Sequence, residues 1–203
     1  MKKIFTLIAM ALAATTVNAQ TIFFTAADAA SAGELNGKEF SVDNFKLTIT
    51  DTNGKISIDE NTVYFGDANT QKKSGGGRLK SGGKSSANAN NLLTLSIPTA
   101  GKLNVFVRTG SNSATDRNVI ITQSETELCN QVVKEDDAVK VKGLDEKDLE
   151  KETNVYPIIS VDVAAGEVII TYPTGSMNFY GFELIAGSAS VSSIKAQQTD
   201  SAI

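Results

Sequence analysis

The chain has 203 residues, of which 41% are hydrophobic, 21% charged and 6% aromatic, and it contains no histidine, no tryptophan and one cysteine. Without imidazole side chains it cannot form Ser-His-Asp or Cys-His triads or most zinc, copper and non-haem iron sites, because these need a ring nitrogen of near-neutral pKa. The formal net charge of −4 makes nucleic acid an unfavourable general partner, since phosphate backbones attract basic surfaces. The single cysteine, Cys129, is expected to be a small buried residue, with intermolecular pairing or a reactive thiol as alternatives.

The first segment has the pattern of a secretory signal peptide. Lys2 and Lys3 precede an apolar run over 4–14, and the small-residue spacing Val17-Asn18-Ala19 follows. A run of about 11 residues is shorter than the roughly 20 that a transmembrane helix requires, and no later stretch approaches that length. We therefore expect residues 1–19 to be a leader, and the mature protein to be exported to the periplasm or the medium without a transmembrane segment.

The next elements are a short helical start and a β-hairpin. The Ala-rich residues 26–32 are sufficient for one or two helical turns. Apolar and polar residues alternate over 47–50 and again over 55–59, and Asn53-Gly54 lies between the two runs. Both residues of this pair accept the positive φ of a type I′ turn, so the pattern predicts a hairpin.

The carboxylates of this hairpin resemble a calcium loop in composition only. With Asp51 counted as the first position of such a loop, glycine falls at the fourth rather than the sixth, and no glutamate stands at the twelfth. We therefore expect no cofactor and read these carboxylates as turn and surface residues. Calcium remains the alternative, with candidate ligands at Asp51, Asn53, Asp59 and Glu60, or in later loops at Asp67, Asp116 and Asp162.

Short β-branched runs bounded by Gly, Asn, Asp and Ser continue to the end of the chain. Two stretches are not predicted as strands: 71–91, a long loop in which only 78–80 is extended, and 144–152, a charged loop or single helical turn. No segment is long enough for a regular crossover helix, so the pattern predicts an all-β fold, an antiparallel two-sheet β-sandwich or jelly roll with long loops. The domain is expected over 20–186, followed by a disordered C-terminal tail over 187–203. The predicted strands are 62–65, 92–97, 102–108, 118–122, 138–141, 158–163, 167–172 and 178–185.

The most informative polar segment is the loop R-T-G-S-N-S-A-T-D-R, which joins two predicted strands. It carries Arg108, Asn112, Asp116 and Arg117, and the extended segment 78–80 adds two further cations, Arg78 and Lys80. Arginine presents a planar fork of donors to carboxylates, sulfates or vicinal hydroxyls, while aspartate and asparagine accept hydrogen bonds from sugar hydroxyls. The set is therefore a candidate site for an acidic or neutral glycan. The alternative is that Asp116 or a strand carboxylate pairs with these arginines and holds the loop in place.

The last predicted hairpin gathers aromatic residues in the segment Y-P-T-G-S-M-N-F-Y-G-F. If Phe182 faces the core, strict alternation places Tyr180 and Asn178 on the same face and Phe179 on the other. Tyr180 is then a core residue with a hydrogen-bonded hydroxyl, and a platform on which a sugar stacks is the alternative. Tyr180 and Asn178 complete the set of candidate ligand-binding residues.

Four segments of the chain together resemble a known group of domains. They are R-L-K-S-G-G-K-S-S, N-L-L-T-L-S-I-P-T-A-G-K-L-N-V-F-V-R-T-G-S, D-R-N-V-I-I-T and V-D-V-A-A-G-E-V-I-I-T-Y-P-T-G-S-M-N-F-Y-G-F-E-L. They are similar to the carbohydrate-binding-module-like, galactose-binding-type β-sandwich of secreted proteins from glycan-degrading anaerobic bacteria. The resemblance covers 21–185, and in that group the domain occurs alone or attached to pectate lyases. It implies an exported β-sandwich that binds polysaccharide, but it supplies no site residues, and the absence of tryptophan departs from a stacking platform.

Three functions remain open on the sequence. The first is a non-catalytic carbohydrate-binding domain that recognises a polysaccharide through hydrogen bonds from its loops. The second is a structural or adhesive surface protein that binds a protein partner. The third is a polysaccharide lyase, in which Lys80, Arg108 and Tyr180 are candidates for the base and for neutralising a uronate carboxylate.

Overall fold

The computed structural model describes residues 19–31, 33–85 and 90–187. The predicted leader therefore lies outside the described residues except for Ala19, and so does the predicted tail except for Gly187. Among the described residues, no helix has the length and apolar character needed to cross a membrane.

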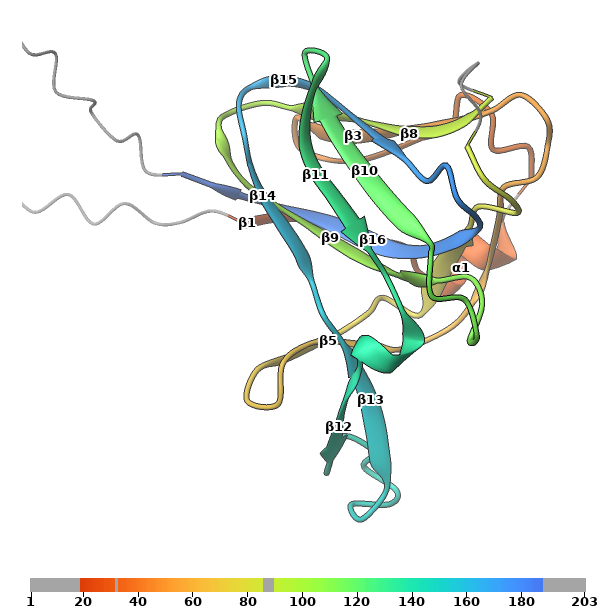
Figure 1. The fold of residues 1–203 in the computed structure, drawn as a ribbon, viewed down its shortest axis with the longest axis vertical. Helices are drawn as coiled ribbons and strands as arrows, with labels where there is room; N and C mark the ends of the chain where they lie inside the picture. Colours follow the sequence, from red (N-terminus) through yellow and green to blue (C-terminus); the bar gives the residue numbers. More distant parts are fainter. Residues whose placement is uncertain (1–18, 32, 86–89, 188–203) are drawn as a thin grey trace, which may run out of the picture.

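Three β-sheets form the domain (Figure 1). The central sheet runs in the order β14 (Ile159–Val163), β9 (Gly101–Thr109), β16 (Met177–Ala186), β7 (Gly77–Lys80) and β4 (Ser57–Glu60), and β1 (Ala19–Phe23) also pairs with β16. The back sheet runs β11 (Thr126–Val132), β10 (Asn118–Gln123), β15 (Gly166–Thr171), β8 (Asn91–Ile97), β3 (Phe45–Asp51) and β2 (Glu39–Val42). The small sheet runs β12 (Val139–Lys142), β13 (Glu152–Tyr156), β5 (Tyr64–Gly66) and β6 (Gln71–Lys73).

The central and back sheets form the predicted sandwich. Both are antiparallel throughout, and their inward-facing residues build one large hydrophobic core. Alternation is clear in β9, where Leu103, Val105 and Val107 face this core while Asn104 and Phe106 point to the opposite face. The prediction of an all-β, two-sheet sandwich is therefore confirmed, and the predicted helical start is found as α1 (Ala26–Ala30).

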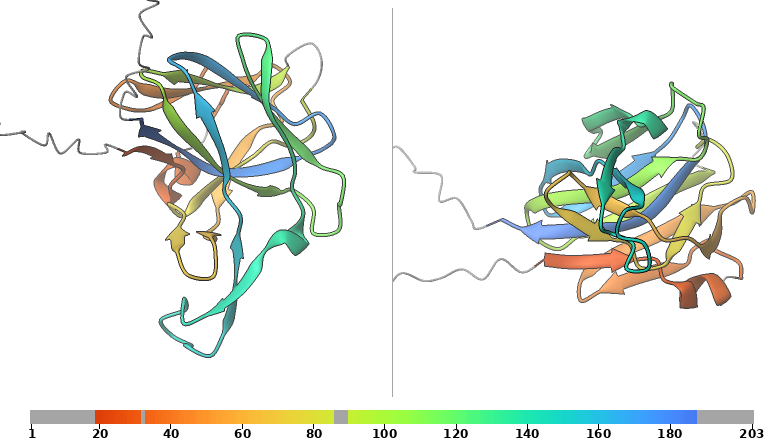
Figure 2. Two further views of the ribbon diagram at one scale, coloured as in Figure 1. Left: turned by 60° about the vertical axis from the view of Figure 1, so that its left-hand side comes forward. Right: turned by 90° about the horizontal axis from the view of Figure 1, so that it is seen from below.

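The small sheet is a third layer that the sequence pattern did not indicate. It covers part of the outer face of the central sheet, and the hairpin of β12 and β13 extends away from the rest of the chain (Figures 1 and 2). A second aromatic cluster, made by Phe65, Phe106, Tyr156 and Tyr180, lies between the two sheets. Residues 71–91 were predicted as a loop outside 78–80, but Gln71–Lys73 forms β6, because its backbone pairs with β5 despite its polar side chains.

The predicted hairpin over 47–59 is wrong. Residues 47–51 belong to β3 in the back sheet, whereas 57–60 form β4 in the central sheet, so this segment connects the two layers. The Asp51 carboxylate accepts hydrogen bonds from the backbone N–H groups of Lys55 and Ile56 at 2.9 Å each, which stabilises the bend. Gly54 has positive φ but Asn53 does not, so the type I′ geometry that would return the chain along β3 does not form.

Strict alternation is also wrong in β16. The pairing with β9 shifts register between Phe179 and Gly181, which places one extra residue in β16. As a result Phe179 and Phe182 both face the large core, while Tyr180 faces the outer aromatic cluster. A Cβ on Gly181 would lie 2.4 Å from the carbonyl oxygen of Ile22, so glycine permits the close approach of β1 at this bulge.

A partly buried ion pair links the small sheet to the central sheet. The Lys72 ammonium of β6 contacts the Glu183 carboxylate of β16 and lies 5.4 Å from the ring centroid of Phe106. Glu183 also accepts hydrogen bonds from Asn104 at 2.9 Å and from Thr21 at 3.1 Å. Burial alone would raise the pKa of Glu183, but the hydrogen bonds from Lys72 and Asn104 outweigh it and hold the pKa below its ordinary value of 4.5.

Acid is therefore expected to weaken this link. Because the folded-state pKa of Glu183 is lowered, its contribution to stability is present above its ordinary pKa and is lost as the pH falls through the folded value. Urea unfolding of the natural protein and of Glu183→Gln at about pH 6.5 and about pH 3.5 measures the effect. The difference in free energy of unfolding between the natural protein and Glu183→Gln should be smaller at the lower pH. An equal difference between the two proteins at both pH values would contradict the prediction.

Candidate functional site

Three of the predicted site residues lie side by side on the outer face of the central sheet. Asn178 of β16 is paired with Lys80 of β7 on one side and with Arg108 of β9 on the other. Directly paired residues project from the same face of a sheet, and Leu79 and Val107 on the neighbouring positions face the core. The row therefore assembles residues that are up to about 100 positions apart in the sequence.

The row ends at a pocket of about 400 Å³, which we call the end pocket. It lies where β7 and β9 finish and β16 starts, at the opposite end of β16 from its pairing with β1. In Figure 1 this is the end of the central sheet away from the two grey terminal traces. The end pocket is lined by Arg78, Lys80, Ser81, Gly82, Gly110, Ser176 and Asn178.

Arg78 is held by a carboxylate of the neighbouring strand. Its guanidinium donates to both oxygens of Asp59 in β4, at 2.8 and 2.9 Å, and the Lys80 ammonium donates to the same carboxylate at 3.2 Å. The hydrogen bond from Arg78 is the main reason that the pKa of Asp59 is lowered from its ordinary value. The bidentate pair uses two of the five N–H donors of Arg78 and fixes its orientation, and Lys80 uses one of its three.

Arg108 is part of the contact between the central sheet and the segment that leads to the small sheet. Its guanidinium donates to Glu135 at 2.8 Å and lies 4.6 Å from the ring centroid of Tyr156, whose hydroxyl donates to the same carboxylate at 2.6 Å. Glu135 starts the short 3₁₀ helix η1 (Glu135–Asp137). The alternative of pairing with an internal carboxylate thus holds for Arg78 and Arg108, although the carboxylates are Asp59 and Glu135 and not Asp116.

The remaining loop residues lie at the rim. Arg117 donates to the carbonyl oxygen of Ser176 at 2.8 Å and to its Oγ at 2.5 Å, and so joins the 110–117 loop to the turn before β16. Asn112 accepts a long hydrogen bond of 3.4 Å from Arg108. Asp116 is exposed, and its carboxylate has no hydrogen bond or ion pair within the described part of the chain. Arg117 therefore shapes the end pocket from behind Ser176, and Asp116 does not enter it.

Tyr180 is buried, as predicted, and its hydroxyl donates to Asn61 at 2.8 Å. Burial raises the pKa of Tyr180, and the neighbouring Arg108 and Arg78 offset only part of this effect. The hydroxyl therefore keeps its proton at neutral pH, and the burial of the residue keeps it out of reach of a polysaccharide. Tyr180 cannot serve as an exposed stacking platform either, because no part of the residue is accessible.

Sequence reasoning missed the small residues that form the pocket. Ser81, Ser176, Gly82 and Gly110 were not among the candidates, although S-G-G directly after a strand signals a tight loop. Gly82 has a φ of +63°, and a Cβ there would lie 1.9 Å from the carbonyl oxygen of Lys55. Only glycine lets this loop pass so close to its neighbour.

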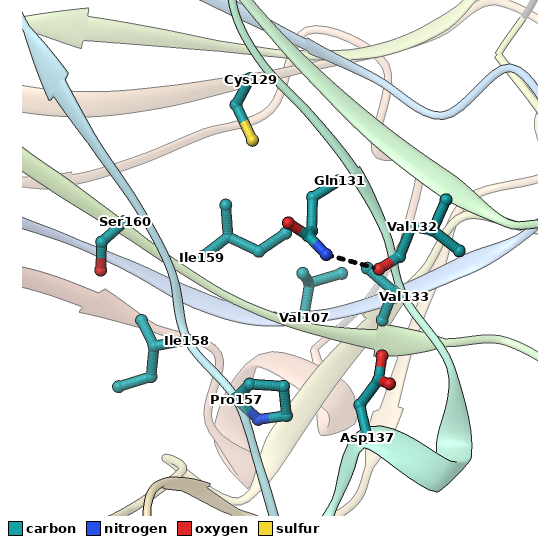
Figure 3. A pocket seen from close by; sticks show the side chains of 10 residues that line it. All are labelled: Val107, Cys129, Gln131, Val132, Val133, Asp137, Pro157, Ile158, Ile159 and Ser160. Atoms are coloured by element: carbon teal, nitrogen blue, oxygen red, sulfur yellow. Dashed lines mark hydrogen bonds between the residues drawn. The ribbon is translucent and has the colours of Figure 1, made fainter.

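A second pocket, of about 360 Å³, opens between the edge strands β11 and β14 (Figure 3). Its walls are mostly apolar, and Figure 3 shows Cys129 and Ile159 facing one another across it. The Gln131 amide donates to the backbone of Val132, and Ser160 donates to Asn104, so these polar groups are already used. Cys129 is half-buried, and burial, then the charge of Glu127, raises the pKa of its thiol, which favours the protonated form.

No group of three or more Cys, Asp or Glu side chains in the described ranges is arranged to hold a metal ion. Most of the carboxylates considered for calcium have other partners: Asp51 accepts from the backbone, Asp59 from Arg78 and Lys80, and Asp162 from Lys102. Asp67 also accepts from the backbone, at Asn69 and Thr70.

No family model matches this chain, and no curated protein matches it either. Among solved structures, a chain from a study of glycan recognition by the Ruminococcus flavefaciens cellulosome is 16% identical, with a TM-score of 0.41, covering 83% of this chain and 94% of that one. The catalytic unit of a GH87 α-1,3-glucanase from Streptomyces thermodiastaticus is 14% identical, with a TM-score of 0.38, covering 72% of this chain and 26% of that one. A carbohydrate-binding module of Cellvibrio mixtus lichenase 5A, solved with cellotriose, is 13% identical, with a TM-score of 0.28, covering 64% of this chain and 88% of that one. All three TM-scores are below 0.5, so these structures resemble the chain only in part.

Proposed function

We propose that this protein is a non-catalytic carbohydrate-binding domain that holds a polysaccharide at the end pocket. The observation that carries the proposal is the composition of that pocket, in which every lining residue is polar or glycine and none is an acid. Hydroxyl-rich ligands need convergent hydrogen-bonding groups, and a pocket at the meeting point of three loops is open enough for one unit of a longer chain.

Catalysis is not part of the proposal. Among the residues considered for a lyase, Tyr180 keeps its proton and Arg108 is paired with Glu135 beneath the surface. Binding through a few exposed hydrogen bonds is expected to be weak, because both the sugar and the side chains must lose water and become ordered. Export, which the leader pattern over 1–19 predicts, would bring the domain to polysaccharides outside the cell.

The test compares two asparagine variants. Asn178 lies in the end pocket, and its Oδ1 accepts no hydrogen bond from the described residues, whereas Asn130 lies on β11 of the back sheet and accepts from Asn118. Asn178→Ala should weaken binding to the best polysaccharide of a neutral and acidic panel about tenfold, which is the value of one or two hydrogen bonds. Asn130→Ala should leave binding unchanged.

Isothermal titration or affinity electrophoresis measures the binding, and circular dichroism confirms that each variant is folded. The proposal fails if the folded natural protein binds no member of the panel. It also fails if Asn130→Ala weakens binding as much as Asn178→Ala does. Capture of a protein but no polysaccharide would instead favour the adhesive function.

A further inference from the structure

The groups of the end pocket differ in how much of their hydrogen-bonding capacity is already used. The Ser81 hydroxyl donates to the carbonyl of Gly83 and accepts from the backbone N–H of Met177, at 2.8 Å each. The Ser176 hydroxyl accepts from Arg117, and the Asn178 amide donates to the carbonyl of Thr109 at 3.3 Å. The neutral side chains of the pocket therefore have few donors left for a ligand.

The more exposed of the two cations that line the pocket is Lys80, with its ammonium group. Within the described residues it contacts one carboxylate oxygen, on Asp59, at 3.2 Å, and that carboxylate is already bonded by both nitrogens of the Arg78 fork. An ammonium group has three N–H donors, so two are free, and 43% of the Lys80 side chain is exposed. The pocket thus presents a partly compensated positive charge and not a neutral set of donors.

The charges around the pocket are mostly positive, and the Asp59 carboxylate is shared by Arg78 and Lys80. The loop over 81–85 carries Lys84 and no acid, and the turn over 173–176 carries no charge at all. The third loop, over 110–117, carries one charge of each sign, but its cation faces Ser176 while its acid lies outside the pocket. This end of the central sheet is therefore cationic on a chain whose formal net charge is −4.

We propose, on the basis of the proposed carbohydrate-binding function, that the end pocket selects sugar units that carry an anionic group, which Lys80 binds directly. A carboxylate or a sulfate on the sugar would complete the ammonium's hydrogen bonds and neutralise its charge. Charge-assisted hydrogen bonds of this kind are about twice as strong as neutral ones. A neutral sugar leaves the ammonium uncompensated in the contact, and so it binds more weakly.

Paired polysaccharides test the selectivity. Polygalacturonate and its fully methyl-esterified form differ in the carboxylate charge, and dextran sulfate and dextran differ in the sulfate. We expect the natural protein to bind at least one anionic member about tenfold or more tightly than its neutral counterpart. The first pair reports on carboxylates and the second on sulfates, so the two sources of the charge are distinguished.

Variants at Lys80 test whether this residue binds the anionic group, and Lys102 is the matched control. Lys102 lies on the same face, at the other end of β9, and forms an exposed pair with Asp162. Lys80→Gln should weaken binding to the anionic polysaccharide about tenfold and remove most of its salt dependence, Lys80→Arg should retain binding, and Lys102→Gln should have no effect. The melting temperature of each variant shows whether the fold is retained.

The outcomes separate this inference from the function on which it rests. Equal or tighter binding of the neutral members overturns the anionic selectivity but leaves carbohydrate binding intact. Anionic binding that survives Lys80→Gln, or that Lys102→Gln removes equally, overturns the role of Lys80. Absence of binding to every member of both pairs and of the wider panel overturns the proposed function as well.

Discussion

Replacing Phe106 with alanine is expected to lower the free energy of unfolding by about 4 kcal/mol, because a fully buried aromatic ring leaves a large cavity. The Phe106 ring lies on the outer face of the central sheet, with its centroid 5.0 Å from that of Phe23 and 5.5 Å from that of Phe65. Phe65 belongs to β5, so this contact joins the small sheet to the sandwich. Loss of the ring should therefore loosen the small sheet before it affects the large core.

Urea denaturation measures the loss in stability, and hydrogen exchange measures where it occurs. The amides of β5 and β13 should exchange faster than those of β8 and β15 in the back sheet. Val139→Ala, at an exposed position of the same small sheet, is the control and should change the free energy of unfolding by less than about 0.5 kcal/mol. A loss below about 1 kcal/mol, or uniform exchange across all three sheets, would argue against this role for Phe106.

Replacing Glu135 with alanine is expected to cost about 3 kcal/mol of stability. The substitution leaves the Arg108 side chain, of which only 14% is exposed, without its carboxylate, and it leaves the Tyr156 hydroxyl without its acceptor. The Arg108 Nε already has no partner among the residues described, so the buried charge would lose its strongest contact. Tyr156 is itself buried, and this burial, followed by the hydrogen bond to Glu135, raises its pKa to about 12.

Two variants separate the charge of Glu135 from its size. Glu135→Gln keeps the volume but removes the charge and one of the two acceptor oxygens, so its loss should be intermediate. Asp136→Ala changes an exposed carboxylate on the next residue and should be almost neutral. Thermal and urea unfolding of the three variants at neutral pH show how their losses of stability rank. Equal losses for Glu135→Ala and Asp136→Ala would show that the buried pair contributes nothing.

The candidate site was partly recoverable from the sequence. Arg78, Lys80 and Asn178 were chosen for their hydrogen-bonding chemistry, and the structure brings them to one pocket. Their partners were not recoverable, because Asp59 meets Arg78 only through the pairing of β4 with β7, and Glu135 meets Arg108 only through the path of the chain into the small sheet. The sequence contains many other carboxylates at similar separations, and nothing local distinguishes these two.

The fold class followed from period-two alternation in short runs, since a strand with one buried face must alternate and no segment was long enough for a regular crossover helix. Local patterns failed where a distant segment decided the geometry. Asn53-Gly54 predicted a hairpin, but backbone pairing sends β3 and β4 to different sheets. The bulge at Tyr180 reversed the faces of β16, and the polar residues of β6 became a strand because β5 offered them a backbone partner. Alternation depends on neighbouring residues, so it can be read from the sequence. Strand partners, register and the cation that each carboxylate binds depend on contacts between residues far apart in the chain, and these contacts form only when the three sheets pack together.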